Sequence, residues 1–187
     1  MKKIIWLFFF LPFIVSAQKP VVKIKSGAIS GIEKNGIHIF KGIPFAAPPV
    51  GDLRWKAPQP VKPWTNVKEC TAFGPSPFQQ SPFPFMCWSA EYLIPKEPIN
   101  EDCLYLNVWT PRLSQTDIGQ SKNLPVMMWI HGGGNTVGSA HMYDPSVLVS
   151  EHNVIVVTIQ YRMGSLGWFR HPALHDSLSS LSDLSGN

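Results

Sequence analysis

The chain has 187 residues, of which 44% are hydrophobic and 15% are charged, with 16 Lys and Arg against 12 Asp and Glu. This length is enough for one domain with a sizeable core. The formal charge of +4 is small, and without a clustered basic face it argues against a nucleic-acid-binding protein.

The N-terminus predicts a secretory signal peptide over residues 1–17. The letters MKK are followed by an apolar run at 4–15 and by small residues at 16–17, which is the order of a charged region, a hydrophobic region and a cleavage site. The apolar run is too short to cross a bilayer comfortably, and no cysteine follows it directly to carry a lipid. We therefore expect a mature chain that begins at Gln18, is secreted or periplasmic, and does not stay in the membrane.

The first half of the mature chain predicts little regular structure. Short β-type runs at 21–24 and 37–40, separated by glycine-containing turns, predict a small antiparallel hairpin or meander. Six prolines between 42 and 63 exclude a regular helix or a central strand there and predict extended surface chain. The segment 70–101 is rich in proline and aromatic residues without a regular period, which indicates a long, ordered loop.

Three later runs predict the central sheet. LYLNVW (104–109) is typical of a strand, and the apolar runs at 125–130 and 154–160 are typical of strands buried on both faces of a parallel sheet. Residues 146–152 predict a short helix between the last two runs, which makes a β-α-β crossover. We therefore expect an α/β fold with a mixed, mainly parallel sheet and a small antiparallel N-terminal hairpin.

The sequence MWIHGGGN (128–135) places three consecutive glycines directly after a predicted strand. In ester hydrolysis the carbonyl oxygen becomes an oxyanion, and fixed N–H donors aimed at that oxygen are among the largest contributors to rate. Glycine permits backbone angles that are closed to other residues and lets a substrate approach the peptide plane. The pattern is that of the oxyanion loop of esterases, although a flexible turn or a phosphate-binding loop fits the glycines alone equally well.

Four segments, in order and at suitable spacing, resemble the type-B carboxylesterase and cholinesterase family of serine hydrolases. They are FKGIPFAAPPVGDLRWKAPQP (40–60), EDCLYLNVWTP (101–111), VMMWIHGGGNTVGSAHMYD (126–144) and VIVVTIQYRMGSLGWF (154–169). EDCLYLN is one of the family's two signature motifs and is highly specific. The resemblance covers residues 18–187 as the N-terminal portion of a carboxylesterase type-B domain, and it implies the N-terminal part of an α/β-hydrolase fold.

The resemblance implies roles for several residues around the glycines. Gly133 and Gly134 match the two glycines whose N–H groups line the family's oxyanion hole, while His131 and Gly132 match residues that shape the approach to it. Trp88 resembles the tryptophan that faces a cationic substrate group in cholinesterases, which implies a place in the gorge wall. Outside this set, the sequence departs mildly from the family near the sheet, where many members have Asn at the position of Gln160.

The cysteines alone leave the pairing open, because three cysteines pair in three ways with one left over. The resemblance implies that Cys103 forms the family's first disulfide with Cys70 as its partner, with no role given to Cys87. Such a bond is permitted in an exported chain and would contribute about 3 to 4 kcal/mol by the loop-entropy model. The resemblance also implies a structural ion pair between Arg54 and Glu101, where two solvated side chains fit the sequence equally well.

No G-x-S-x-G nucleophile motif occurs among the 187 residues. In the nearest segment, MGSLG (163–167), Met163 works against the tight turn and no histidine follows the later carboxylates, so Ser165 is predicted to be a turn residue. Ser139 lies near the glycines but lacks the elbow. The later histidines show no metal-binding spacing, since only His171 and His175 are four apart and a proline lies between them.

The resemblance therefore implies a serine carboxylesterase acting on a small-molecule carboxylic ester, without a metal or another cofactor. The final letters, LSGN, resemble the start of the family segment that precedes the nucleophile strand. We expect the serine, acid and histidine beyond Asn187 and no catalysis by this chain alone. The alternative is a noncatalytic esterase-like adhesion or binding protein of the same family. The intact glycine triplet favours the enzyme, because a pure scaffold does not need it.

Overall fold

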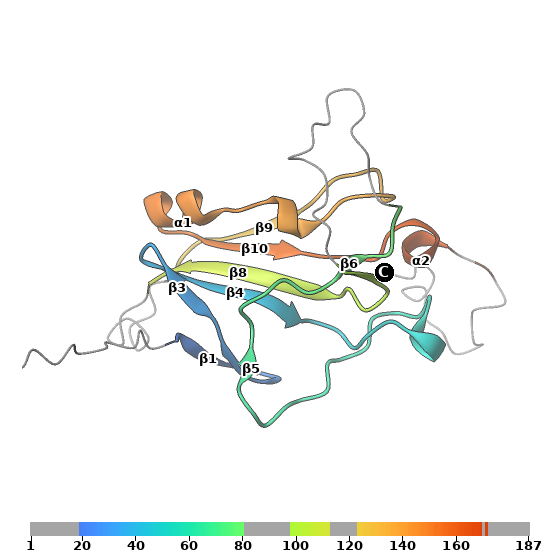
Figure 1. Ribbon diagram of the computed structural model, residues 1–187, viewed down its shortest axis with the longest axis horizontal. Coiled ribbons are helices and arrows are strands. Elements are labelled where there is room, and N and C mark those ends of the chain that lie inside the picture. Colours follow the sequence, from blue (N-terminus) through green and yellow to red (C-terminus); the bar gives the residue numbers. More distant parts are fainter. Residues whose placement is uncertain (1–18, 81–97, 113–122, 170, 172–187) are drawn as a thin grey trace, which may run out of the picture.

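The computed structural model describes residues 19–80, 98–112, 123–169 and 171, and strands dominate it (Figure 1). The predicted signal peptide, Cys87, Trp88 and His175 lie outside these ranges. Among the described residues, no helix combines the length and the hydropathy that crossing a bilayer would need. The elements are β1 (Val21–Ile24), β2 (Gly27–Ser30), β3 (Ile32–Lys34), β4 (Ile37–Pro44), η1 (Gly51–Leu53), β5 (Lys68–Glu69), β6 (Ser76–Pro77), β7 (Ile99–Asn100), β8 (Tyr105–Pro111), β9 (Val126–Ile130), η3 (Ala140–Met142), α1 (Ser146–His152), β10 (Ile155–Ile159) and α2 (Gly164–Trp168).

The main sheet has five strands in the order β3-β4-β8-β10-β9. Only β10 and β9 run parallel, while the β3–β4, β4–β8 and β8–β10 pairs are antiparallel. The prediction of a mixed sheet is confirmed, but the prediction that it is mainly parallel is wrong for the described residues. The reason lies in the connections, since only the crossover through α1 brings the chain back to start a strand in the same direction.

The N-terminal strands form two hairpins instead of one. β1 pairs with β2 in a small sheet completed by β5, which lies below β4 in the view of Figure 1. β3 pairs with β4 through a two-residue turn, in which Asn35 and Gly36 have positive φ angles of 51° and 76°. An Asn-Gly pair with both φ angles positive is the turn that matches the twist of a tight hairpin.

The segment predicted as extended surface chain, 42–63, is so only in part. Its first three residues belong to β4, which bulges between Phe40 and Ile43, where Gly42 has a φ angle of +69° and its N–H donates to Asn107 Oδ1 at 2.9 Å. Proline is tolerated in this strand because Pro44 is its last residue. Beyond it the segment holds only the 3-10 helix η1, as the prolines predict.

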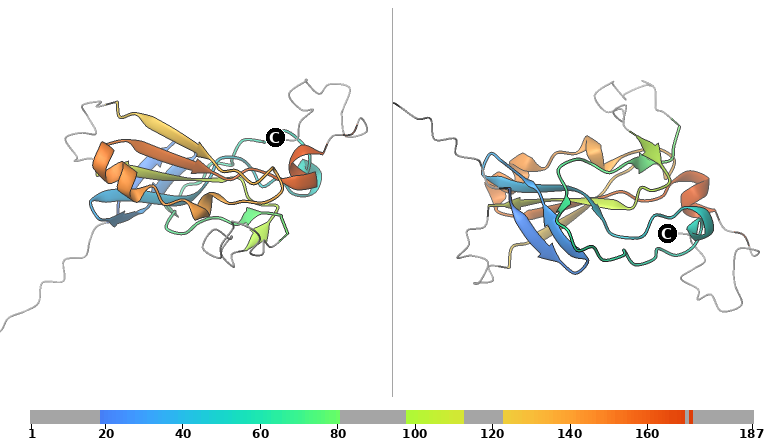
Figure 2. Two further views of the ribbon diagram at one scale, coloured as in Figure 1. Left: turned by 90° about the horizontal axis from the view of Figure 1, so that it is seen from above. Right: turned by 60° about the horizontal axis from the view of Figure 1, so that its bottom comes forward.

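The β-α-β crossover is confirmed, and the bounds of α1 equal the predicted range 146–152. α1 packs on the sheet through Val149, which is fully buried against Ile39, Trp109 and Val156. Figure 2 shows α1 lying along one side of the sheet. Asn153 ends the helix in the left-handed conformation at φ 53°, a common way to terminate a helix.

The prediction that both apolar runs form strands buried on both faces is wrong for β9. β9 is a strand, and it is parallel to β10 as predicted. All five of its side chains are nevertheless at least 45% exposed, because β9 is the edge strand of the described sheet and has β10 as its one neighbour there. An apolar run predicts that a strand will be covered, but it does not say which part of a protein covers it.

The structure does not show the predicted disulfide, since Cys70 and Cys103 are free thiols in it. Each is buried in a different apolar cluster, Cys70 with Ile29 and Phe40, and Cys103 with Leu104. Burial raises the pKa of both thiols, to about 12 for Cys103. Both therefore remain protonated and act as small apolar side chains in the core.

Candidate functional site

The candidate site is the loop of residues 131–138, here called the glycine loop, which begins where β9 ends. Gly133 and Gly134 have φ angles of +124° and +62°. The carbonyl oxygen of Gly133 accepts hydrogen bonds from the N–H groups of Thr136 and Val137, both at 3.2 Å. A Cβ atom on Gly133 would lie 1.6 Å from the carbonyl oxygen of Val137. The fold of the loop therefore admits only glycine at position 133.

The N–H groups of Gly133 and Gly134 donate to no acceptor within the described part of the chain. Both glycines line an open pocket at the carboxyl ends of β9 and β10, together with Ile130, Ile159 and Tyr161. Ligands in open α/β sheets bind in the crevice outside the carboxyl ends of strands. The two N–H groups are thus available to a group of negative charge that enters this pocket.

The direction of both N–H groups follows from the carbonyl groups in the same peptides. Nδ1 of His131 lies 3.0 Å from the carbonyl oxygen of Gly132, which can only accept, so this nitrogen carries the proton. In a trans peptide the N–H points opposite to the C=O. Holding the Gly132 carbonyl therefore turns the Gly133 N–H away, and the bonds to the Gly133 carbonyl do the same for the Gly134 N–H.

His131 contributes to the lining of the pocket but is only 3% exposed. Its ring stacks on Tyr161 at a centroid distance of 4.4 Å, and the Tyr161 hydroxyl donates to the His131 carbonyl oxygen. Burial lowers the pKa of His131, so the imidazole is neutral near pH 7. Its geometry suits the support of a loop and not the exchange of protons with a substrate.

A buried amide network behind the loop was missed by sequence reasoning. Gln160 is fully buried, donates to Ser139 Oγ at 2.9 Å and accepts from the Ala140 N–H at 3.0 Å. Ser139 Oγ also accepts from the His141 N–H and lies 3.1 Å from Ser76 Oγ. Both lone pairs of Ser139 are used and its hydroxyl is inaccessible, which rules it out as a nucleophile. The only feature of the sequence that could have pointed to this network was Gln160 itself, which stands where many family members have Asn.

The other predicted residues lie apart from the glycine loop. Ser165 was predicted to be a turn residue but lies exposed in the short helix α2, where its carbonyl accepts from Trp55 Nε1 at 2.8 Å. The predicted ion pair of Arg54 with Glu101 is confirmed, with two contacts of 2.8 Å. No group of three or more potential metal ligands occurs among the residues that the structure describes.

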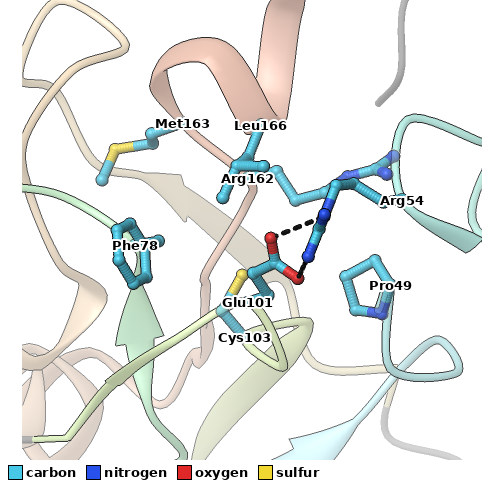
Figure 3. A pocket seen from close by; sticks show the side chains of 8 residues that line it. All are labelled: Pro49, Arg54, Phe78, Glu101, Cys103, Arg162, Met163 and Leu166. Atoms are coloured by element: carbon cyan, nitrogen blue, oxygen red, sulfur yellow. Dashed lines mark hydrogen bonds and ion pairs between the residues drawn. The ribbon is translucent and has the colours of Figure 1, made fainter. Parts of the chain in front are cut away.

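The ion pair closes a small cavity next to α2 (Figure 3). Figure 3 shows Glu101 facing the Arg54 guanidinium, with Cys103, Arg162 and Leu166 around them. The Arg162 guanidinium, which is buried, also donates to the Lys56 carbonyl oxygen at 3.0 Å. The cavity has room for about one water molecule, so this cluster joins loop segments and does not receive a substrate.

Acid is expected to destabilise the chain through His141. The ring stacks on Phe73 at 4.3 Å, and burial, with smaller effects of Lys41 and His131, lowers its pKa to about 4. The unfolded chain, with a histidine pKa of about 6.5, takes up the proton first as the pH falls. The stability contributed by neutral His141 is therefore present above pH 6.5 and is lost as the pH falls toward 4.

We expect the urea midpoint to fall across this window, and to fall less in His141→Phe, which keeps an aromatic ring on Phe73. His152→Phe is the matched control, because His152 is exposed at the end of α1. The same loss of midpoint between pH 6.5 and 4 in His141→Phe and in the parent would contradict this assignment.

Comparison with known proteins gives one consistent result. The Carboxylesterase family model matches residues 18–179. Carboxylesterase 1D of Rattus norvegicus is 44% identical over 163 residues, which cover 82% of this chain and 28% of the relative. Liver carboxylesterase of Sus scrofa is 42% identical over the same shares.

Solved structures agree with the sequence relatives. A PNB esterase aligns with a TM-score of 0.72 and 39% identity, covering 83% of this chain and 30% of that one. A carboxylesterase of Geobacillus stearothermophilus aligns at 0.67 and 36% identity, covering 80% and 28%. The chain spans 28% of the length of both curated relatives.

Proposed function

The chain belongs to the carboxylesterase family, and we propose that it is the N-terminal part of a serine carboxylesterase that hydrolyses small-molecule carboxylic esters. The observation that carries this proposal is the pair of unengaged N–H groups on Gly133 and Gly134 at the carboxyl ends of β9 and β10. Donors fixed in this way stabilise the oxyanion of an acyl-transfer intermediate without reorganising during the reaction.

In the proposed reaction a serine attacks the ester carbonyl carbon and the alcohol leaves, after which water releases the carboxylate. Gly133, Gly134 and one further N–H from a later part of the protein hold the tetrahedral oxyanion. His131 and Gly132 act through the direction of the peptide plane between Gly132 and Gly133. This chemistry requires no metal or organic cofactor.

We propose that the nucleophile, the acid and the histidine come from sequence beyond Asn187. G-x-S-x-G is absent from the 187 residues, and the relatives extend over more than three times the matched length. We also propose that residues 1–17 are removed on export, to the periplasm or the medium. N-terminal sequencing of the exported chain is expected to begin at Gln18.

The chain of 187 residues is expected to be inactive on its own. A fluorophosphonate probe should leave it unlabelled, and a short-chain nitrophenyl ester should be hydrolysed no faster than in buffer, because the activated serine is missing. Intact-protein mass measurement and absorbance at the nitrophenolate band are the readouts, with a complete family esterase as the positive control. Stoichiometric labelling of the purified chain would overturn this part of the proposal.

Reading the coding DNA beyond codon 187 in all three frames separates the enzyme from the alternative. An intact G-x-S-x-G a few dozen residues further on is the expected result. A replaced serine in an otherwise intact segment would support the noncatalytic adhesion or binding protein instead. The glycine-only conformation at position 133 favours the enzyme, because a scaffold gains nothing from a loop that admits only glycine.

A further inference from the structure

A side chain from a distant segment holds the end of the glycine loop. Gln79 follows β6, and its carboxamide engages both polar groups of Gly138. The Gly138 N–H donates to Gln79 Oε1 at 2.8 Å, and Gln79 Nε2 donates to the Gly138 carbonyl oxygen at 2.9 Å. Nε2 also donates to the Pro77 carbonyl oxygen at 3.1 Å, which fixes the amide on its own segment.

Gly138 packs against His131 and the Gly132 carbonyl, the groups that orient the Gly133 N–H. Its φ angle is +131°, and a Cβ atom there would lie 2.4 Å from the Gly132 carbonyl oxygen and 2.6 Å from His131 Nδ1. The neighbouring Val137 carbonyl occupies the space next to Gly133 in the same way. Residues 137–138 therefore form the back wall against which the glycines fold.

We propose that Gln79 is a positioning residue for the oxyanion donors, acting through Gly138. The role of these N–H groups in catalysis rests on the proposed function. The claim that Gln79 holds Gly138 in place rests on the contacts alone. Gln79 is not among the residues that line the pocket beside the glycines, so it does not touch a substrate there. By fixing Gly138, it keeps the Gly132 carbonyl turned inward and the Gly133 N–H turned outward.

The rest of the same segment does not duplicate this role. Ser76 Oγ lies 3.1 Å from Ser139 Oγ and ties the segment to the start of η3, one residue beyond Gly138. That contact locates the segment but leaves the Gly138 N–H and C=O unengaged. Within the described residues, Gln79 alone provides hydrogen-bond partners for the Gly138 N–H and C=O groups.

The test compares amide hydrogen exchange of the peptide covering residues 131–138 in the parent, Gln79→Glu and Gln79→Leu. Glutamate has the shape of glutamine, but its carboxylate only accepts hydrogen bonds, so at pH 7.5 it repels the Gly138 carbonyl. At pH 4 a glutamate with the ordinary pKa of about 4.3 is mostly protonated, and the protonated side chain again donates one bond and accepts one. The parent at each pH is the reference, which removes the pH dependence of exchange chemistry and of His131.

At pH 7.5 we expect both variants to exchange about tenfold faster than the parent in the loop peptide. At pH 4 the ratio should return toward one for Gln79→Glu and stay high for Gln79→Leu. Gln59→Glu is the matched control, since Gln59 is exposed and its side chain bonds only to the nearby Ala57 carbonyl oxygen. The β8 peptide, 105–111, should exchange as in the parent throughout.

Three results would overturn the inference. The first is an unchanged exchange rate of the loop peptide in Gln79→Leu. The second is the same exchange ratio at both pH values in Gln79→Glu. The third is an equal rise in the loop and in β8, which would show that Gln79 supports global stability only. Gln79→Glu is compared with itself at two pH values, so the test survives if Gln79→Leu fails to fold. The measurement uses no ester, so failure of the proposed function would leave its result intact.

Discussion

Gly133→Ala is expected to disrupt the glycine loop and to lower the free energy of unfolding by about 2 to 4 kcal/mol. Two effects combine at this position. The added Cβ would lie 1.6 Å from the Val137 carbonyl oxygen, and the φ angle of +124° is one that only glycine adopts readily. Relief requires Val137 to move, which breaks the hydrogen bonds that the Gly133 carbonyl accepts.

Gly132→Ala is the matched control for this experiment. No atom lies within 4 Å of a Cβ built at Gly132, and its φ angle is outside the positive range. Urea denaturation of both variants measures the difference in stability, and hydrogen exchange of the 131–138 peptide locates it. A Gly133→Ala loss as small as that of Gly132→Ala would show that the loop tolerates a side chain at position 133.

Gln160→Leu is expected to lower the free energy of unfolding by about 3 kcal/mol. Leucine fills a similar volume but offers no hydrogen bond, so the Ala140 N–H loses its acceptor and Ser139 Oγ loses a donor in a fully buried site. A buried polar group left without a partner costs more than the bond itself contributed. The effect therefore exceeds that of a typical exposed substitution.

The control is Gln59→Leu, because the Gln59 side chain is exposed and bonds only to the nearby Ala57 carbonyl oxygen. We expect its free energy of unfolding to stay within about 0.5 kcal/mol of that of the parent. Thermal and urea unfolding of both variants give the comparison. A Gln160→Leu variant as stable as the parent would mean that the network is not needed to hold η3 beneath the sheet.

Local chemistry made several features predictable from sequence. Residues 146–152 were predicted as a helix and observed as one, because a short helical pattern between two apolar runs has few other solutions. The parallel pairing of β9 with β10 follows from the same crossover. The glycine loop was predictable because three glycines after a strand restrict what the backbone can do there.

Features that depend on distant partners were not predictable. The number of antiparallel pairs in the main sheet depends on the pairing of β4 with β8. The hydrophobic pattern of a strand does not identify the strand with which it pairs. The disulfide was predicted from resemblance, yet the thiols of Cys70 and Cys103 lie in separate clusters. Gln79 and Gln160 carry no motif, since an amide becomes important only when the fold places it against particular backbone groups.

The β4–β8 pairing has a consequence for synthesis on the ribosome. In the β4–β8 pair, His38 lies opposite Thr110. The other edge of β8 pairs with β10, where Val156 lies opposite Trp109. With about 60 residues between β4 and β8, closure of this sheet is entropically costly and slow. Ile37 and Ile39 of β4 therefore emerge long before their cover exists. A nascent chain of this design therefore stays open until both β8 and β10 have been synthesised.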